Sequence, residues 1–168
     1  NVALPEPAGV RRIDVETAAQ LAAAAEEEFA SAHVLLMAAA PADFRAAEVA
    51  AGKLSREGAL DLHLEPTEDI LASLAAARGD SQTIVGFAAE HGGEASARAR
   101  EKLVRKNADL IVLNDVSDPE IGFESEDNAV TLVEPEAETE VAIDSKDAIA
   151  ETILDKVGEL RLEAGYTA

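Results

Sequence analysis

The sequence predicts an α/β protein built on a doubly wound, mostly parallel sheet with helices on both faces. Apolar runs that suit strands buried on both faces, such as 33–40 and 83–90, alternate with helix-like segments rich in Ala, Leu and Glu. This alternation is typical of βαβ units joined by right-handed crossovers. A chain of 168 residues is long enough for one domain with its own core, so we expect residues 1–168 to form a single domain.

The first elements are predicted from local signals. Residues 10–15 (VRRIDV) are a short strand candidate, and Asp14 is expected to cap a helix at 16–30. The apolar run at 33–40 follows as a buried strand. Residues 60–65 alternate between apolar and polar side chains, which indicates a further strand.

The second half of the chain repeats the alternation of helix and strand as far as residue 115, after which turn residues become frequent. Two helix–strand pairs are expected, at 69–79 with 83–90 and at 93–107 with 109–115. Residues 116–143 carry turn residues between two alternating runs and predict a hairpin-like excursion. Ser145 is the predicted N-cap of a closing helix at 145–161. Four apolar residues are expected on one face of that helix: Ile149, Ile153, Leu154 and Val157.

Composition excludes several classes of function. The chain has 14 Lys and Arg against 34 Asp and Glu, a net charge of −20, which argues against nucleic acid or an anionic membrane as a partner. Cysteine is absent, which excludes disulfides and thiolate chemistry and suits a cytoplasmic protein. No apolar run approaches the roughly 20 residues of a membrane span. Neither a GxGxxG nor a Walker motif occurs.

One helix breaks the acidic pattern. Five cations fall within nine residues: Arg98, Arg100, Lys102, Arg105 and Lys106. Glu94 and Glu101 stand four residues before Arg98 and Arg105, so both arginines have intrahelical partners available. Lys102 and Lys106 have no such carboxylate. They are either an anion site or part of a solvated face, and Lys106 also suits the last turn of a helix that Asn107 ends.

Polar residues at predicted strand ends form a second group of candidates: Asp43, Glu90, Asn114 and Asp115. Ligands of open α/β sheets bind beyond the carboxyl ends of the strands. Asp43 has two readings. It would hold Mg²⁺ beside a phosphate, or it would cap a helix starting near residue 44.

Six segments appear in one order: MAAAPADFR, GKLSREG, EPTEDIL, IVGFAAE, ARAREKLVRKNADLIVLNDV and GFESEDNAVTLV. With these gaps they closely resemble the phosphopantothenate cysteine ligase family, the synthetase half of a bifunctional bacterial enzyme of coenzyme A biosynthesis. The resemblance covers nearly all of residues 1–160. It implies a Rossmann-like fold that binds CTP with Mg²⁺.

The resemblance also implies a two-step reaction. The carboxylate of 4′-phosphopantothenate attacks the α-phosphate of CTP, and pyrophosphate leaves an acyl cytidylate. The amine of L-cysteine then displaces CMP and forms the amide. Such chemistry needs positioning and cations opposite the phosphate charge more than a covalent protein group.

Site residues follow from the matching motifs. The resemblance assigns Ala40, Asp43 and Phe44 to the nucleotide and its metal, with Asp43 as the metal ligand. Lys53 matches a lysine that stabilises the activation step from a flexible lid. The remaining nucleotide contacts implied are Phe87, Ala88, Lys102 and Lys106.

The chain departs from the family pattern in three places. The family's KIKK is here KLSR, which leaves Arg56 to replace one charge, and KNPDIL is here PTEDIL. The family's first βα unit, with its Gly-rich phosphate loop and an asparagine, is expected before residue 1.

The resemblance also implies a homodimer, often fused to a flavin-dependent decarboxylase. The alternative function is a non-catalytic nucleotide-binding or assembly module.

Overall fold

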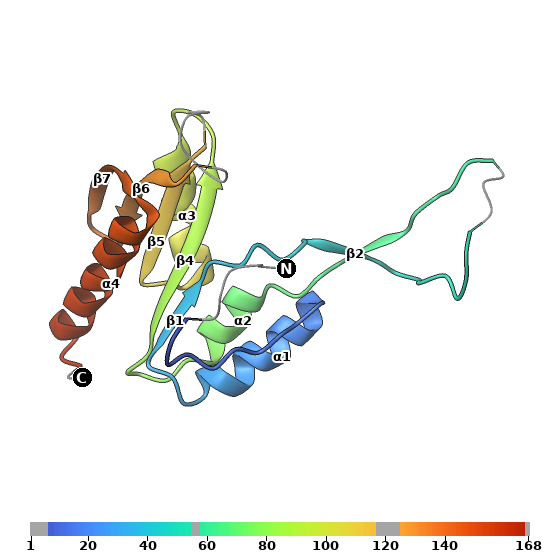
Figure 1. Cartoon of the computed structure of the whole chain (residues 1–168), viewed down its shortest axis with the longest axis horizontal. Coiled ribbons are helices and arrows are strands. Elements are labelled where there is room, and N and C mark those ends of the chain that lie inside the picture. The colour runs from blue at the N-terminus through green and yellow to red at the C-terminus, as the bar shows by residue number, and fades with distance from the viewer. Residues whose placement is uncertain (1–6, 55–57, 117–124, 167–168) are drawn as a thin grey trace.

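A five-stranded sheet forms the centre of the fold. The structure is a computed structural model that describes residues 7–54, 58–116 and 125–166. The strand order is β1-β4-β5-β6-β7 (Figure 1). Its strands are β1 (Val34–Met37), β4 (Thr83–Glu90), β5 (Leu110–Asp115), β6 (Asp127–Val133) and β7 (Glu138–Ser145).

The sheet is mixed rather than mostly parallel. β1, β4 and β5 pair in parallel, whereas β5 with β6 and β6 with β7 pair antiparallel. The two alternating runs of the predicted excursion form the hairpin of β6 and β7. This hairpin extends the main sheet because β6 returns beside β5. Part of the predicted segment, 117–124, lies outside the described residues.

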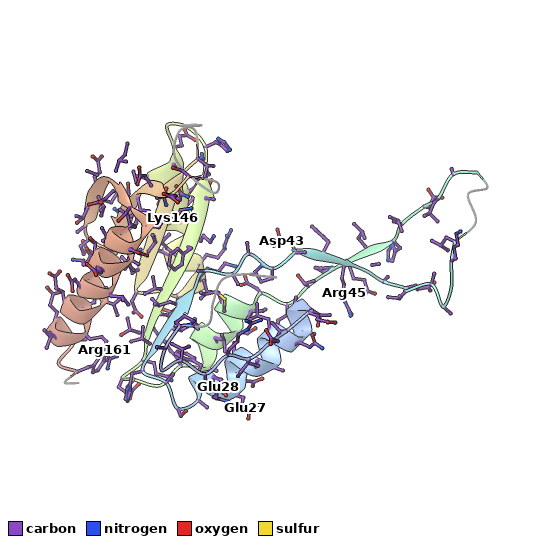
Figure 2. All side chains as sticks on the ribbon, in the orientation of Figure 1. Glu27, Glu28, Asp43, Arg45, Lys146 and Arg161 are labelled. Carbon is purple, nitrogen blue, oxygen red and sulfur yellow. The ribbon has the colours of Figure 1, made fainter. Side chains whose placement is uncertain are left out.

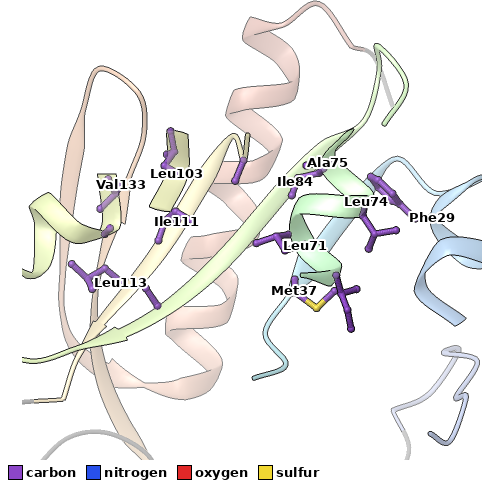
Figure 3. Close-up of a cluster of buried hydrophobic side chains, with 14 of the residues drawn as sticks. Phe29, Met37, Leu71, Leu74, Ala75, Ile84, Leu103, Ile111, Leu113 and Val133 are labelled. Atoms are coloured by element: carbon purple, nitrogen blue, oxygen red, sulfur yellow. The ribbon is translucent and has the colours of Figure 1, made fainter. Parts of the chain in front are cut away.

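Helices cover both faces of the sheet, as predicted. Three helices, α1 (Ala18–Phe29), α2 (Ile70–Ala77) and α3 (Ala95–Lys106), pack on one face, and α4 (Lys146–Glu163) packs on the other. Ile84 and Ile111 point into the α1–α3 core, which Figure 3 shows, whereas Val85 and Val112 point toward α4. Burial on both faces explains why these strands read as continuous apolar runs.

Helix ends follow local capping rules with one correction. Thr17, not Asp14, caps α1: its side chain accepts a hydrogen bond from the Gln20 amide, and Gln20 closes a capping box. Asp14 instead pairs with Arg12. The other two predictions are confirmed, because Ser145 caps α4 and Asn107 ends α3 in the left-handed conformation, with φ of 50°.

The strand predicted at 10–15 is absent. These residues are irregular and largely exposed, and Ile13 is 44% exposed. No described segment pairs with them. Because a strand exists only with a partner that satisfies its backbone, local propensity was insufficient here.

A long arm projects from the body between β1 and α2 (Figure 1). Its base is a two-stranded ribbon of β2 (Phe44–Ala46) and β3 (Leu64–Pro66), paired antiparallel. The predicted strand at 60–65 is thus present only at its end. Asp43 precedes β2 and not a helix, so the helix-cap reading of Asp43 is wrong.

Helix α4 keeps most of its predicted apolar face. Ile149, Ile153 and Val157 are buried, but Leu154 is 54% exposed because it lies at the margin of the contact with the sheet. In the described part of the chain, no helix combines the length and the apolar character that crossing a bilayer needs.

Candidate functional site

β4 continues beyond the carboxyl end of β1, and we call this step, where Lys102 meets the Phe87 carbonyl oxygen, the notch. β1 pairs with β4 as far as Met37 and Gly86, and Phe87 is the next residue of β4. The Phe87 carbonyl oxygen accepts a hydrogen bond of 2.8 Å from Lys102 Nζ of α3. One of the two predicted lysines therefore lies at the strand end that bears Phe87.

Lys106 lies one turn further along α3 and contacts α2. Its ammonium forms an ion pair with Asp69, and its side chain is only 14% exposed. Asp69 is also the N-cap of α2, accepting from the Ala72 amide at 3.1 Å. As the sequence indicated, Lys106 has no carboxylate partner within α3 among the described residues; its partner comes from another helix, which helical spacing could not predict.

Burial and neighbouring charges shift the pKa values of Lys102 and Asp69. Burial lowers the pKa of Lys102, and the cations Lys106 and Arg105 lower it further, against an opposing effect of Glu90. Burial by itself would raise the pKa of Asp69, but hydrogen bonds from Lys106 and from the Ala72 amide outweigh it, so the pKa is lowered overall. The notch is thus a partly desolvated cationic site.

Two arginines of α3, Arg98 and Arg100, are held by tertiary contacts. Arg98 donates to Glu90 at 2.7 Å and to the His91 carbonyl oxygen, not to Glu94 as the sequence predicted. Arg100 donates to the Glu134 and Pro135 carbonyl oxygens and to Glu138. These contacts place α3 against the sheet. Of the two lysines, Lys102 donates to the Phe87 carbonyl oxygen and Lys106 pairs with Asp69.

The Phe87 ring lines a pocket of about 320 Å³ between the sheet and α4. Its walls are mostly apolar, and they include Leu36, Val112 and Ile153 together with Asn114 and Asn128. Ala88 points to the opposite face, where its side chain is 5% exposed inside the α1–α3 core. The backbone of Ala88, and not its side chain, is therefore the part that a ligand could contact.

Ala40 and Phe44 line a different hollow. It measures about 400 Å³ and lies between the segment after β1, the start of α1 and Thr67. The Phe44 side chain is exposed, and Asp43 accepts the Thr67 amide at its carbonyl oxygen, 2.8 Å away. Figure 2 shows Asp43 where the chain leaves the body for the arm. The predicted nucleotide residues thus fall into two groups that line different hollows or make different contacts: Ala40, Asp43 and Phe44 at the base of the arm, and Phe87, Ala88, Lys102 and Lys106 at the end of β4.

Lys53 is exposed in the loop of the arm, which projects away from the notch (Figure 1). The structure does not bring it together with Lys102. Arg56, the other predicted loop cation, lies outside the described residues, as does the side chain of Asp115. Among the described residues, no group of three or more His, Asp or Glu side chains is arranged so that it could hold a metal ion.

Sequence reasoning missed two residues of this region. Asp69 appeared only as part of a predicted helix, and its ion pair spans 37 positions. Asn128 was not singled out. The alternating pattern of 127–133 does place it on the same face as Val130, and that was the available signal.

The fold and the site define a class of protein. An open α/β sheet with an apolar pocket and a lysine at the carboxyl ends of its parallel strands is typical of ligand-binding α/β domains.

Comparisons with known proteins specify the family. Residues 1–160 match the family described as "DNA/pantothenate metabolism flavoprotein C-terminal domain". The chain belongs to this family, which confirms the resemblance seen in the sequence.

Relatives include the coenzyme A biosynthesis bifunctional protein CoaBC of Vibrio cholerae, 39% identical over 94% of this chain and 40% of the relative. The CoaBC protein of Mycobacterium bovis is 40% identical over 92% of this chain and 39% of the relative. The chain therefore spans about two fifths of the length of these curated relatives.

Two solved structures share the fold. The C-terminal domain of a CoaBC protein superposes with a TM-score of 0.76 and 30% identity, over 96% of this chain and 70% of that one. A DNA/pantothenate metabolism flavoprotein from Streptococcus pneumoniae gives a TM-score of 0.75 over 92% of this chain and 76% of that one; at 21% identity it supports the fold alone.

Proposed function

We propose that this domain is a CTP-dependent ligase that joins 4′-phosphopantothenate to L-cysteine in the cytoplasm. The carboxylate oxygen of phosphopantothenate bonds to the α-phosphorus of CTP, and the bond to the β-phosphate breaks with release of pyrophosphate. The cysteine amine then attacks the acyl carbon, CMP leaves, and the amine loses a proton. Family membership and similarity to CoaBC proteins support this reaction class.

The observation that carries the proposal is the notch itself. Lys102 uses one of its donors on the Phe87 carbonyl oxygen and keeps two for a ligand. Lys106 lies one helical turn further along, largely buried and paired with Asp69, whose carboxylate offsets part of its charge. Two cations in a partly desolvated site favour the phosphate groups of a nucleotide, and they do so more strongly than the same charges in open solvent.

Mg²⁺ is compatible with the residues present. It is commonly bound through one or two carboxylates together with substrate phosphates, so the single carboxylate of Asp43 fits. The ion would neutralise phosphate charge. Asp43 would hold it at the base of the arm, beside the hollow that Phe44 and Ala40 line.

Lys53 is proposed to act on the activation step. Because the arm holds it away from the notch of its own chain, this role requires the arm to fold back or a second copy of the chain to supply Lys53. Mixing Lys53→Ala with Lys102→Met protein separates these cases. Activity that returns on mixing indicates supply across subunits, whereas two variants that stay inactive together indicate folding back.

A homodimer is proposed on the apolar surface of the arm. Six apolar residues of the arm are more than half exposed: Phe44, Val49, Leu54, Leu60, Leu62 and Leu64. Such a cluster is unusual for an exposed ribbon and suits a protein interface. Sedimentation of the chain, and of a Leu60→Ser, Leu62→Ser variant, tests it. A wild-type monomer at micromolar concentration would contradict the dimer.

The sheet edge supports the proposal that the complete domain has a further βα unit. Within the described chain, β1 pairs only with β4. α2 connects β1 to β4 and covers the same face of the sheet as α1. With right-handed crossovers, a strand that precedes α1 would lie on the side of β1 opposite to β4, at the free edge of the sheet. A strand at that edge would give residues 10–15 a sheet to join.

The experiment is pyrophosphate release from CTP in the presence of Mg²⁺, measured for the chain alone and with such a βα unit joined to it. We expect release that depends on phosphopantothenate and is lost in Lys53→Ala while CTP still binds. CTP binding without release in either form would favour the non-catalytic nucleotide-binding module. Absence of both would reject the nucleotide function.

A further inference from the structure

Helix α3 packs on β5 and reaches the strands on either side of it. In the sheet, β5 lies between β4 and β6. Residues two apart on a helix point about 200° apart, so Arg100 and Lys102 leave α3 on opposite flanks. Lys102 donates to the Phe87 carbonyl oxygen of β4, and Arg100 donates to carbonyl oxygens directly after β6. The side chains of α3 that are buried between these flanks are Ala95, Ala99 and Leu103.

Arg100 binds the turn between β6 and β7 at three points. Its Nη1 atom donates to the carbonyl oxygen of Glu134 at 3.0 Å and to that of Pro135 at 2.7 Å. Its Nη2 atom donates to the Glu138 carboxylate at 2.5 Å. A guanidinium presents its donors in a rigid planar fork, so these contacts fix its orientation as well as its distance. Arg100 therefore restrains the rotation of α3 about its own axis.

The turn is itself anchored to the other layer of helices. The Glu134 amide donates to the Ala137 carbonyl oxygen at 2.9 Å, which closes the turn. The Glu134 side chain is buried, and its carboxylate forms an ion pair of 2.9 Å with Lys156 of α4. Because α3 binds the turn from one face of the sheet and α4 binds it from the other, the turn is a fixed point for Arg100.

The rotation of α3 decides where the Lys102 ammonium lies. Ala95 and Ala99 make few dispersion contacts, so the buried face of the helix restrains rotation only weakly. Arg98 and Lys102 hold one flank through Glu90 and the Phe87 carbonyl oxygen. If the opposite flank were released, α3 could turn and draw the ammonium away from the end of β4.

We propose that Arg100 is a positioning residue: its contacts with the β6–β7 turn set the rotation of α3 and thereby hold the Lys102 ammonium at the notch. This inference rests on the proposed function, which assigns Lys102 to the phosphates of the nucleotide. Arg100 acts through the helix, because its guanidinium lies on the flank opposite to Lys102.

The first test compares Arg100→Gln with Lys156→Met. Both variants remove a contact of the same turn, and both should unfold at a lower urea concentration, because Lys156→Met leaves the buried Glu134 carboxylate unpaired. Only Arg100→Gln releases α3. In calorimetry, pyrophosphate binding should weaken about fivefold or more in Arg100→Gln, approaching the loss of one charge-assisted hydrogen bond. It should change by less than about twofold in Lys156→Met, whose site is remote.

The second test needs no ligand. NMR of isotope-labelled lysine follows the titration of the Lys102 ammonium, and Lys102→Met assigns its signal. Burial lowers the pKa of Lys102 below 10.5, so exposure of the ammonium in Arg100→Gln should move the pKa upward, whereas Lys156→Met should keep the wild-type value. Besides burial, four charged groups act on this lysine: Lys106, Glu90, Arg105 and Asp69.

Glu138→Ala separates position from charge and is a milder change, which keeps the test decisive if Arg100→Gln does not fold. It removes one acceptor of Arg100 and leaves the two carbonyl oxygens. Loss of an anion by itself lowers the pKa of a lysine, whereas a looser α3 exposes Lys102 and raises it. We expect a small upward shift of the Lys102 pKa.

The outcomes distinguish this inference from the proposed function. Equal changes in pyrophosphate affinity and in the Lys102 titration for Arg100→Gln and Lys156→Met would overturn the role of Arg100 and leave the ligase proposal standing. A downward shift in Glu138→Ala would do the same. A wild type that binds no pyrophosphate would overturn the phosphate site, and the ligand-free titration would still decide whether Arg100 positions Lys102.

Discussion

Lys102 Nζ lies 2.8 Å from the Phe87 carbonyl oxygen, which joins the basic helix α3 to the end of the central strand β4. The contact links the two parts of the candidate site. The carbonyl oxygen of Phe87 faces the lysines, and its ring lines the pocket beneath α4.

The first prediction concerns Lys102 and pH. Lys102→Met should weaken pyrophosphate binding by about tenfold or more, as expected for loss of a charge-assisted hydrogen bond of roughly 1.5–3 kcal/mol. Burial lowers the pKa of Lys102, so in the wild type the ammonium is lost, and binding weakens, at a pH below the ordinary lysine value of 10.5. Calorimetry across alkaline pH measures both effects.

Folding stability should respond to the same group with the opposite sign. Because the pKa of Lys102 is lower in the folded state, the unfolded chain binds more protons in the interval below 10.5, and the free energy of unfolding gains a rising contribution there as pH increases. Lys102→Met lacks this contribution. Identical pH profiles of wild type and variant in urea unfolding would contradict the assignment.

The second prediction separates the two roles of Asp69. Asp69→Asn keeps a good N-cap for α2 but removes the negative partner of Lys106, so pyrophosphate should bind more tightly by several-fold. Asp69→Ala also loses the cap, which costs about 0.5–2 kcal/mol of stability. Calorimetry and urea unfolding of both variants provide the measurement. Weaker binding in Asp69→Asn would mean that the carboxylate holds Lys106 in its binding position.

The third prediction concerns Gly86, over which α2 packs closely. A Cβ atom at this position would lie 2.8 Å from Ile111 Cδ1 and 3.0 Å from Leu71 Cδ2. Gly86→Ala should therefore destabilise the fold by about 1–3 kcal/mol. Gly158→Ala is the matched control: nothing lies within 4 Å, and alanine in α4 should stabilise by roughly 0.5–1 kcal/mol. Equal unfolding midpoints for the two variants would refute the packing argument.

The fourth prediction follows from the net charge of −20. Repulsion among exposed carboxylates destabilises the compact state, and salt screens it. Raising sodium chloride from about 0.05 to 0.5 M should raise the midpoint of thermal unfolding by several degrees. Sucrose at matched osmolality is the comparison. A midpoint that falls with salt would show that attractive ion pairs dominate.

Local signals in the sequence were sufficient for much of the fold. The apolar runs of β1, β4 and β5 and the N-cap at Ser145 follow from period and capping chemistry, which act within a few residues. The motif resemblance identified the family. Local signals were not sufficient for the strand predicted at 10–15, which is absent. A strand needs a partner strand, and the local sequence does not specify one.

By itself, the sequence determined that this chain alternates strands with helices and that Lys102 and Lys106 share one face of a basic helix. Tertiary structure alone decided that Asp69 meets Lys106, that Arg98 reaches Glu90, and that Asn114 and Asn128 face one pocket. Helical periodicity is a property of neighbouring residues. Charge pairing and burial depend on which distant segments the sheet brings together, and that is settled when the strands pair.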